Sequence, residues 1–174
     1  MNPVVRVLFD RAQGRRLQLL QLADSIPEDY WARHAPGDSW AARHHLVHTL
    51  SADELVERTL REASSGAVDT EALLRERSAA IERGLELDVA ALLKFAAEAR
   101  QSLGQALERL APEALGRPAF VVASSNQWSE PVVVSVVEYL GQWSKHDADH
   151  EAAIRSAIAT TPDLTAIALS RRPR

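Results

Sequence analysis

The chain contains no cysteine. This absence excludes disulfide bonds, thiolate metal sites and cysteine nucleophiles, so a transition-metal site would need histidine, aspartate or glutamate ligands, together with water. A large excess of one charge is also missing, since the 174 residues carry a formal net charge of only −4. The chain therefore lacks the positive field that is typical of nucleic-acid-binding proteins, and we expect no nucleic-acid partner.

Long apolar runs are absent as well. No stretch approaches the roughly 18 consecutive apolar residues of a transmembrane helix. The first residues are interrupted by charges at Arg6, Asp10 and Arg11, so they do not form the apolar core of a signal peptide. We therefore expect a cytoplasmic protein with no membrane partner.

Glycine and proline are few, with seven and eight residues, and they fall mostly between long segments of helical periodicity. The pattern predicts long helices over residues 3–23, 39–63, 88–110 and 131–159, with Pro3, Ser39 and Pro131 at helix starts. A short helix or ordered connector is expected at 69–85. Residues 24–38 and 111–130 are expected to be loops, with a short turn at 28–32 and a short extended piece at 119–122.

Four helices of this length in a chain of this size predict a single all-α domain. The expected architecture is an up-down four-helix bundle with long connecting loops. We expect the bundle domain to span residues 1–160 and a basic C-terminal tail to span residues 161–174.

Histidine is the residue type that carries the chemical signal. Two pairs are spaced four residues apart, His44 with His48 and His146 with His150. Such residues share one helix face, so their imidazoles can converge on one ion. His146 and His150 also lie on the apolar seam expected for the last helix. Two imidazoles in a core are costly unless they are hydrogen-bonded or bind a metal, and both interpretations stay open.

A metal site needs a third protein ligand from a facing helix. His48 is the natural candidate because it lies close to the apolar stripe of its own helix, and His44 is nearly in phase with it. His45 is expected to point elsewhere, toward solvent. His34 falls in a predicted loop and is expected to be solvated.

Motifs for other chemistries are missing. The sequence has no Glu-x-x-His pair of a di-iron bundle, no His-Glu-x-x-His, no Gly-x-Ser-x-Gly elbow and no phosphate loop. The acidic residues near the histidines in sequence are expected to be solvated, or to orient a ligand histidine: they are Asp53, Glu54, Asp147 and Asp149. Trp143 is expected in the core or at a pocket wall. No catalytic residue can be assigned.

Two segments resemble the DinB-like, or YfiT-like, superfamily. In the first, Trp40 precedes a Leu-x-His motif that ends at His48, eight residues after the tryptophan. In the second, His146 and His150 are followed after four residues by Ile154. Residues 26–31 and the Pro-Gly pair before the tryptophan are also similar to the family. Two positions depart from it: Ala41 replaces the usual serine, and a histidine stands at 44 where glutamate is common, which leaves the role of that histidine open.

The resemblance implies a divalent metal ion (zinc, nickel or manganese) held by His48, His146 and His150. It also implies a small-molecule substrate, a low-molecular-weight thiol as a further reactant, and a homodimer. The implied activity is that of a thiol-dependent S-transferase or isomerase, and Arg33 and Arg43 are the candidate cations for carboxylates of the thiol. A non-catalytic metal-binding or helical interaction protein and a metal-dependent hydrolase remain alternatives. Lack of a pocket beside the histidines would favour the non-catalytic protein.

Overall fold

The computed structural model describes residues 1–65, 69–122 and 131–159. The helices in these ranges are α1 (Pro3–Ser25), α2 (Ala42–Ser65), α3 (Thr70–Glu86), α4 (Val89–Arg109) and α5 (Val136–Ala159). Two short 3-10 helices are η1 (Glu28–Tyr30) and η2 (Pro112–Gly116), and two strands are β1 (Pro118–Val122) and β2 (Pro131–Ser135). The strands form one antiparallel pair in which Pro118 lies opposite Ser135 and Val122 opposite Pro131.

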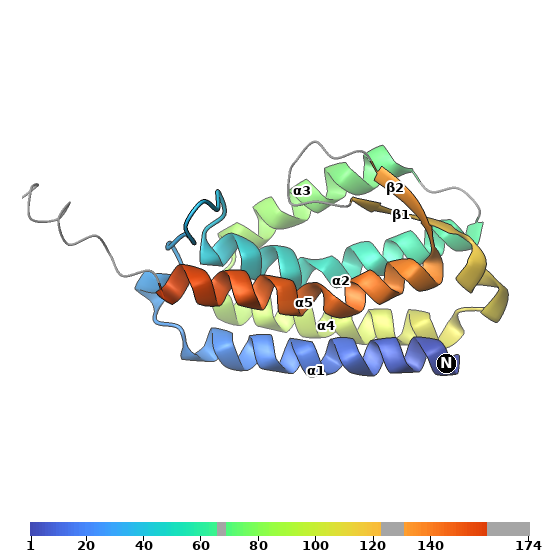
Figure 1. Ribbon diagram of the computed structural model, residues 1–174, viewed down its shortest axis with the longest axis horizontal. Helices are drawn as coiled ribbons and strands as arrows, with labels where there is room; N and C mark the ends of the chain where they lie inside the picture. Colours follow the sequence, from blue (N-terminus) through green and yellow to red (C-terminus); the bar gives the residue numbers. More distant parts are fainter. Residues whose placement is uncertain (66–68, 123–130, 160–174) are drawn as a thin grey trace, which may run out of the picture.

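Four of the helices, α1, α2, α4 and α5, form the bundle, with α3 lying outside it against α2 (Figure 1). Along the chain each helix, α3 included, reverses the direction of the one before it. Within the bundle, α1 and α5 therefore run one way, and α2 and α4 run the other way. The predicted all-α four-helix bundle is thus confirmed. The segment expected to be a short helix or connector is the full helix α3, and the expected tail at 161–174 lies outside the described residues.

Side-chain caps explain why several helices begin where they do. Asn2 accepts a hydrogen bond from the amide of Val4 at 2.9 Å, next to a proline in the first turn of α1. The carboxylates of Asp69 and Asp88 accept from amides in the first turns of α3 and α4, at 2.9 and 2.7 Å. Such caps satisfy amides that have no partner within the helix.

Two predicted helix starts are wrong. Residues 131–135 form β2 instead of the first turn of a long helix, because the β-branched Val132, Val133 and Val134 favour a strand and β1 supplies the pairing partner. Ser39 does not cap α2. Asp38 accepts a hydrogen bond from the amide of Trp40 instead. Ala41 then pairs with His34 in an isolated β-bridge, and the helix begins at residue 42.

The core consists of two apolar clusters, one toward each end of the bundle. Between them, each bundle helix contributes one buried charged residue: Arg16 from α1, Asp53 from α2, Arg100 from α4 and Asp147 from α5. The expectation that Asp53 and Asp147 are solvated is therefore wrong, since their exposed fractions are 0% and 3%. We call these four residues the charged layer.

The charged layer is a closed set of ion pairs with no net charge. Arg16 lies 2.6 Å from Asp147 and 3.4 Å from Asp53, while Arg100 lies 2.7 Å from Asp53 and 3.6 Å from Asp147. Burial alone would raise the pKa of Asp147, but His146 and the two guanidinium groups outweigh it and lower that pKa to about 2. The carboxylate of Asp147 therefore remains ionised inside the bundle.

In the described part of the chain, none of the helices combines the length and apolar character needed to cross a bilayer.

Candidate metal centre

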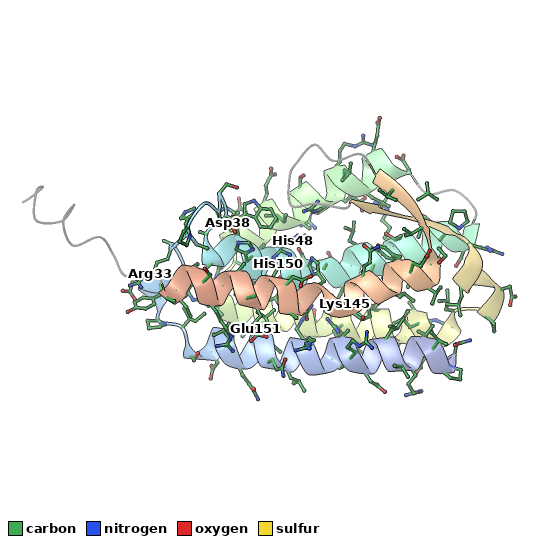
Figure 2. The ribbon with its side chains drawn as sticks, viewed as in Figure 1. Arg33, Asp38, His48, Lys145, His150 and Glu151 are labelled. Atoms are coloured by element: carbon green, nitrogen blue, oxygen red, sulfur yellow. The ribbon has the colours of Figure 1, made fainter. Side chains whose placement is uncertain are left out.

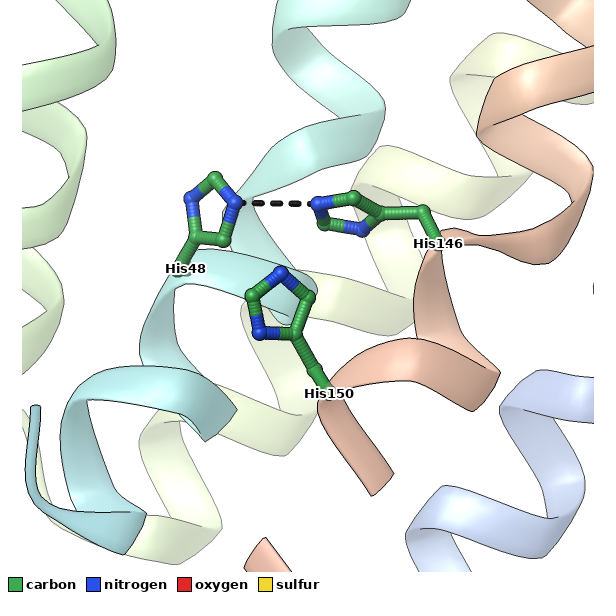
Figure 3. Close-up of side chains that lie close together, drawn as sticks. All are labelled: His48, His146 and His150. Carbon is green, nitrogen blue, oxygen red and sulfur yellow. Dashed lines mark hydrogen bonds between the residues drawn. The ribbon is translucent and has the colours of Figure 1, made fainter. Parts of the chain in front are cut away.

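Three histidines from two facing helices meet in the middle of the molecule. His48 lies on α2, and His146 and His150 lie one turn apart on α5. One ring nitrogen from each lies within 4.8 Å of the others, and the Nε2 atoms of His48 and His146 are 2.9 Å apart. Figure 3 shows the three rings facing one another, with a nitrogen of His150 directed at the other two. The structure thus brings together the three predicted ligands.

Burial and electrostatics favour the neutral form of two of these rings, those of His48 and His150. Burial and the neighbouring histidines lower the pKa of His48 well below its usual value and that of His150 to about 3. A neutral imidazole has a free lone pair, which is the form that binds a metal ion.

The donor set fits a divalent ion. Imidazole nitrogens bind zinc at about 2.0–2.1 Å, which places two ligands of one ion roughly 3.3 Å apart. The 2.9 Å separation between His48 and His146 and the 4.8 Å limit for the whole group bracket that spacing. The Nδ1 atom of His146 is buried without a hydrogen-bond partner, 3.9 Å from a carboxylate oxygen of Asp147. A ligand histidine commonly uses such a carboxylate to orient its second nitrogen.

His45 extends the cluster, contrary to the expectation that it faces solvent. Its Nδ1 lies 2.9 Å from Nδ1 of His150, and its Nε2 lies 3.0 Å from a carboxylate oxygen of Asp38. An ionised carboxylate only accepts hydrogen bonds, so in a neutral His45 ring Nε2 carries the proton and Nδ1 accepts one from His150. This assignment leaves the lone pair of His150 on Nε2, the nitrogen on the side of the other two histidines.

A short turn holds Asp38 in place. The amide of Asp38 donates to the carbonyl of Ala35 at 3.0 Å, with Pro36 and Gly37 at the two central positions. Gly37 has a φ of 78°, so the turn is one that favours proline followed by glycine. Figure 2 shows Asp38, His48 and His150 close together, although one of them comes from a loop and the others from different helices.

Trp40 covers the outer side of the cluster. Its ring is stacked on that of His150 with the centroids 6.2 Å apart, and it meets the rings of His45 and His48 edge-on at 5.3 and 5.2 Å. Trp143 is both core residue and pocket wall, because its indole N–H donates to Asp53 at 3.1 Å while the ring also lines the cavity beside the histidines.

The remaining histidines lie outside the three-residue group. His34 is exposed and pairs its backbone with that of Ala41. His44 is half-buried, and burial, followed by the nearby His34 and His45, lowers its pKa. His44 is therefore not brought to the group as a further ligand.

A cavity of about 1210 Å³ opens beside the three histidines. It lies between α2, α3 and α5, and its wall includes Trp40, Leu55, Leu73, Arg77 and Tyr139. The volume is sufficient for a small organic molecule.

The predicted cations Arg33 and Arg43 do not line this cavity. The guanidinium of Arg33 lies 3.3 Å above the ring of Tyr30 and donates to the carbonyl of Ile158. Arg43 donates to the carbonyl of Leu87. Neither candidate is therefore a cation of this cavity, because contacts in the loop and at the helix end hold both arginines away from its wall.

Solved structures share the fold at low sequence identity. The mycothiol-dependent maleylpyruvate isomerase is 17% identical with a TM-score of 0.67, and a histidine-to-alanine mutant of it is 16% identical with a TM-score of 0.66. Each comparison covers 98% of this chain and 70% of the other. At this identity the likeness establishes the fold alone. No curated protein matches the chain with statistical significance.

The sequence itself carries the family assignment. The model of the DinB superfamily matches residues 11–154, a range that extends from α1 through both histidine motifs almost to the end of α5. The chain therefore belongs to the DinB superfamily.

Proposed function

We propose that the protein is a metal-dependent enzyme that holds a divalent ion with His48, His146 and His150. The observation that carries the proposal is the convergence of one ring nitrogen from each of these residues at the wall of a large cavity. A structural role for the histidines would not require such a cavity. A closed, non-catalytic metal site would also be expected to lack one.

The proposed reaction is thiol-dependent, either an S-transfer or an isomerisation of a small molecule. Support comes from the fold neighbour, which is a mycothiol-dependent isomerase, and from the chemistry of the donor set. Three neutral imidazoles would leave a divalent ion its full charge and open positions, and that charge would favour the deprotonated, nucleophilic form of a thiol in the cavity.

The residues of the chain would bind and orient the reactants. The Asp38–His45 pair fixes the tautomer of His150, and Trp40 shields the histidines from water on one side. The cavity between α2, α3 and α5 would position the electrophilic molecule next to the sulfur. No described residue is assigned as a general base, and the proton of the thiol would pass to water.

The metal site is tested by elemental analysis of purified protein. About one equivalent of zinc, nickel or manganese per chain is expected, falling to roughly a tenth in His48→Ala, His146→Ala and His150→Ala. The matched control is His34→Ala, which removes an exposed histidine outside the group and should leave the metal content unchanged. Absence of metal from the parent protein, even after addition of each ion, would contradict the proposal.

Thiol use is tested on protein loaded with cobalt(II). Addition of 2-mercaptoethanol is expected to produce sulfur-to-cobalt charge-transfer absorption in the parent protein and in His34→Ala. If cobalt binds but the thiol leaves the spectrum unchanged, the metal site stands and the thiol-dependent reaction does not; hydrolysis would then be the chemistry to test. The expected homodimer stays a prediction, which sedimentation analysis would check.

A further inference from the structure

Arg77 is a cation of the cavity that the proposed metal site does not use. It lies on α3, is half-buried, and lines the same cavity as the three histidines. Because Arg77 and the three histidines border one cavity, a small molecule in it can contact both.

The other arginines of the cavity wall are paired or exposed. Arg58 forms ion pairs with Glu62 and Glu76. Arg83 lies 4.0 Å from Glu54, and Arg61 is on the exposed rim.

No acidic residue of the wall neutralises Arg77 within the described part of the chain. Asp38 is bound by His45 and by the amide of Trp40, and Asp149 is exposed. Burial accounts for the lowered pKa of Arg77, with no carboxylate opposing it. A half-buried guanidinium without an acidic partner is costly, and binding an anion would relieve that cost.

The cavity would thus present two positive centres to a ligand. One is the ion held by neutral imidazoles, which do not cancel its charge, and the other is Arg77. A guanidinium binds a carboxylate through two parallel N–H···O hydrogen bonds, a geometry that selects planar anions.

We propose that Arg77 binds the carboxylate of the small molecule that occupies this cavity. The ligand class is a thiol that also carries a carboxylate, with its sulfur at the three histidines and its carboxylate at α3. The sulfur half of this assignment rests on the proposed function, whereas the carboxylate half rests on Arg77 alone.

The first test compares 3-mercaptopropanoate with 3-mercaptopropanamide, which have the same sulfur and length but differ in charge. Their binding to cobalt(II)-loaded protein is followed by charge-transfer absorption. The parent should bind the acid about tenfold more tightly than the amide, and Arg77→Gln should bind both equally, with the amide affinity unchanged. Arg61→Gln, on the exposed rim, should keep the tenfold preference. A preference that persists in Arg77→Gln, or that the parent lacks, overturns the assignment.

The second test needs no metal. The arginine Nε–H signals of metal-free, ¹⁵N-labelled protein are recorded during titration with butanoate and, separately, with butanamide. The signal that disappears in Arg77→Gln is expected to shift with butanoate only. If the protein takes up no cobalt, the proposed function fails and this titration alone decides the role of Arg77. If cobalt and both thiols bind, but neither test shows a preference for the carboxylate, the proposed function stands and the Arg77 assignment is overturned.

Discussion

At the scale of single residues, the contact between His45 and His150 determines how well the site is preorganised. The ring of His150 can rotate, and it can carry its proton on either nitrogen. The hydrogen bonds from His150 to His45 (2.9 Å) and from His45 to Asp38 (3.0 Å) fix both the orientation of the His150 ring and the nitrogen that carries its proton. His45 is thus a positioning residue for the proposed ligand His150.

We expect His45→Ala to weaken zinc binding by about 10–100-fold, the usual cost of losing a group that orients a ligand. The affinity is measured by competition with a chromophoric chelator. His45→Gln should recover part of the affinity, because its amide offers one acceptor and one donor in a similar position.

The matched control for this prediction is His44→Ala, which removes the neighbouring histidine outside the group. It should leave the zinc affinity unchanged. Equal zinc affinities in the parent and in His45→Ala would show that this contact does not orient the site. The free energies of unfolding of these two proteins without metal are also compared, and equal values would exclude a purely structural effect of the substitution.

The sequence predicts some of these residues better than others. The four-residue spacing of His146 and His150 and the helix phase of His48 favour the three proposed ligands, and the resemblance to the DinB-like superfamily completes the set. His45 precedes His48 by three residues, and this spacing also places two side chains on neighbouring parts of one face, so a signal for it exists in the sequence. Arg77 has no such signal, because its role depends on the position of α3 across the cavity.

At the scale of elements, the attachment of α3 to α2 depends on a close approach at one glycine. A Cβ atom at Gly84 would overlap Cγ1 of Val47, a fully buried side chain on α2, and would lie 3.6 Å from Leu92. Gly14 in α1 provides the opposite case, since no atom lies within 4 Å of a Cβ built there. A side chain is therefore excluded at Gly84 by the contact with α2, whereas the space beside Gly14 would accept one.

Gly84→Ala should lower the free energy of unfolding by about 1–3 kcal/mol, as expected for overpacking a close contact. Gly14→Ala should raise it by about 0.5–1 kcal/mol, because alanine loses less backbone entropy in a helix. Urea unfolding followed by circular dichroism measures both. A stabilised Gly84→Ala would mean that α3 is free to move away from α2.

The element boundaries also show what a linear pattern cannot reveal. Helices α1 and α4 begin close to their predicted starts because Asn2 and Asp88 cap them locally. The apolar spacing of residues 131–135 is compatible with a helix. The β-branched valines favour a strand, and the pairing with β1, whose residues lie nine to seventeen positions from their partners, decides for it.

At the scale of the whole molecule, the charged layer divides the bundle core into two apolar halves. Each of its members occupies an apolar-stripe position of its helix: Arg16 follows Ala12 and precedes Leu19, and Asp53 follows Leu50 and precedes Val56. This interruption recurs in all four bundle helices and could have been read from the sequence. The pairing of the charges could not, because it depends on the register of four separate helices.

The charged layer is expected to fix that register. Sliding one helix by a turn would place a buried charge against the apolar residues of a neighbour, which costs several kcal/mol, whereas purely apolar stripes would tolerate the slip more easily. The layer also lies next to the proposed metal site, since Asp147 directly follows His146 on α5. Register and site geometry are therefore coupled through one helix.

A double-mutant cycle between Asp53 and Arg100 tests this coupling. Asp53→Asn retains an acceptor for the indole N–H of Trp143, and Arg100→Met retains much of the arginine's apolar stem. Each single change should lower the free energy of unfolding by about 3–5 kcal/mol, because it leaves a buried charge without its partner. The double variant keeps the balanced pair of Arg16 and Asp147, so its loss should be smaller than the sum of the single losses by about 1–3 kcal/mol.

The control is Arg155→Gln, which breaks an ion pair on the exposed surface of α5 with Glu151 and should change stability by less than about 0.5 kcal/mol. Strict additivity of the two core substitutions would mean that the four charges act independently and do not set the register. The metal content of the three variants is compared as well. If both single variants lose metal and the double variant retains it, then the balance of charge in the charged layer keeps His146 in place beside His48, and neither Asp53 nor Arg100 is needed by itself.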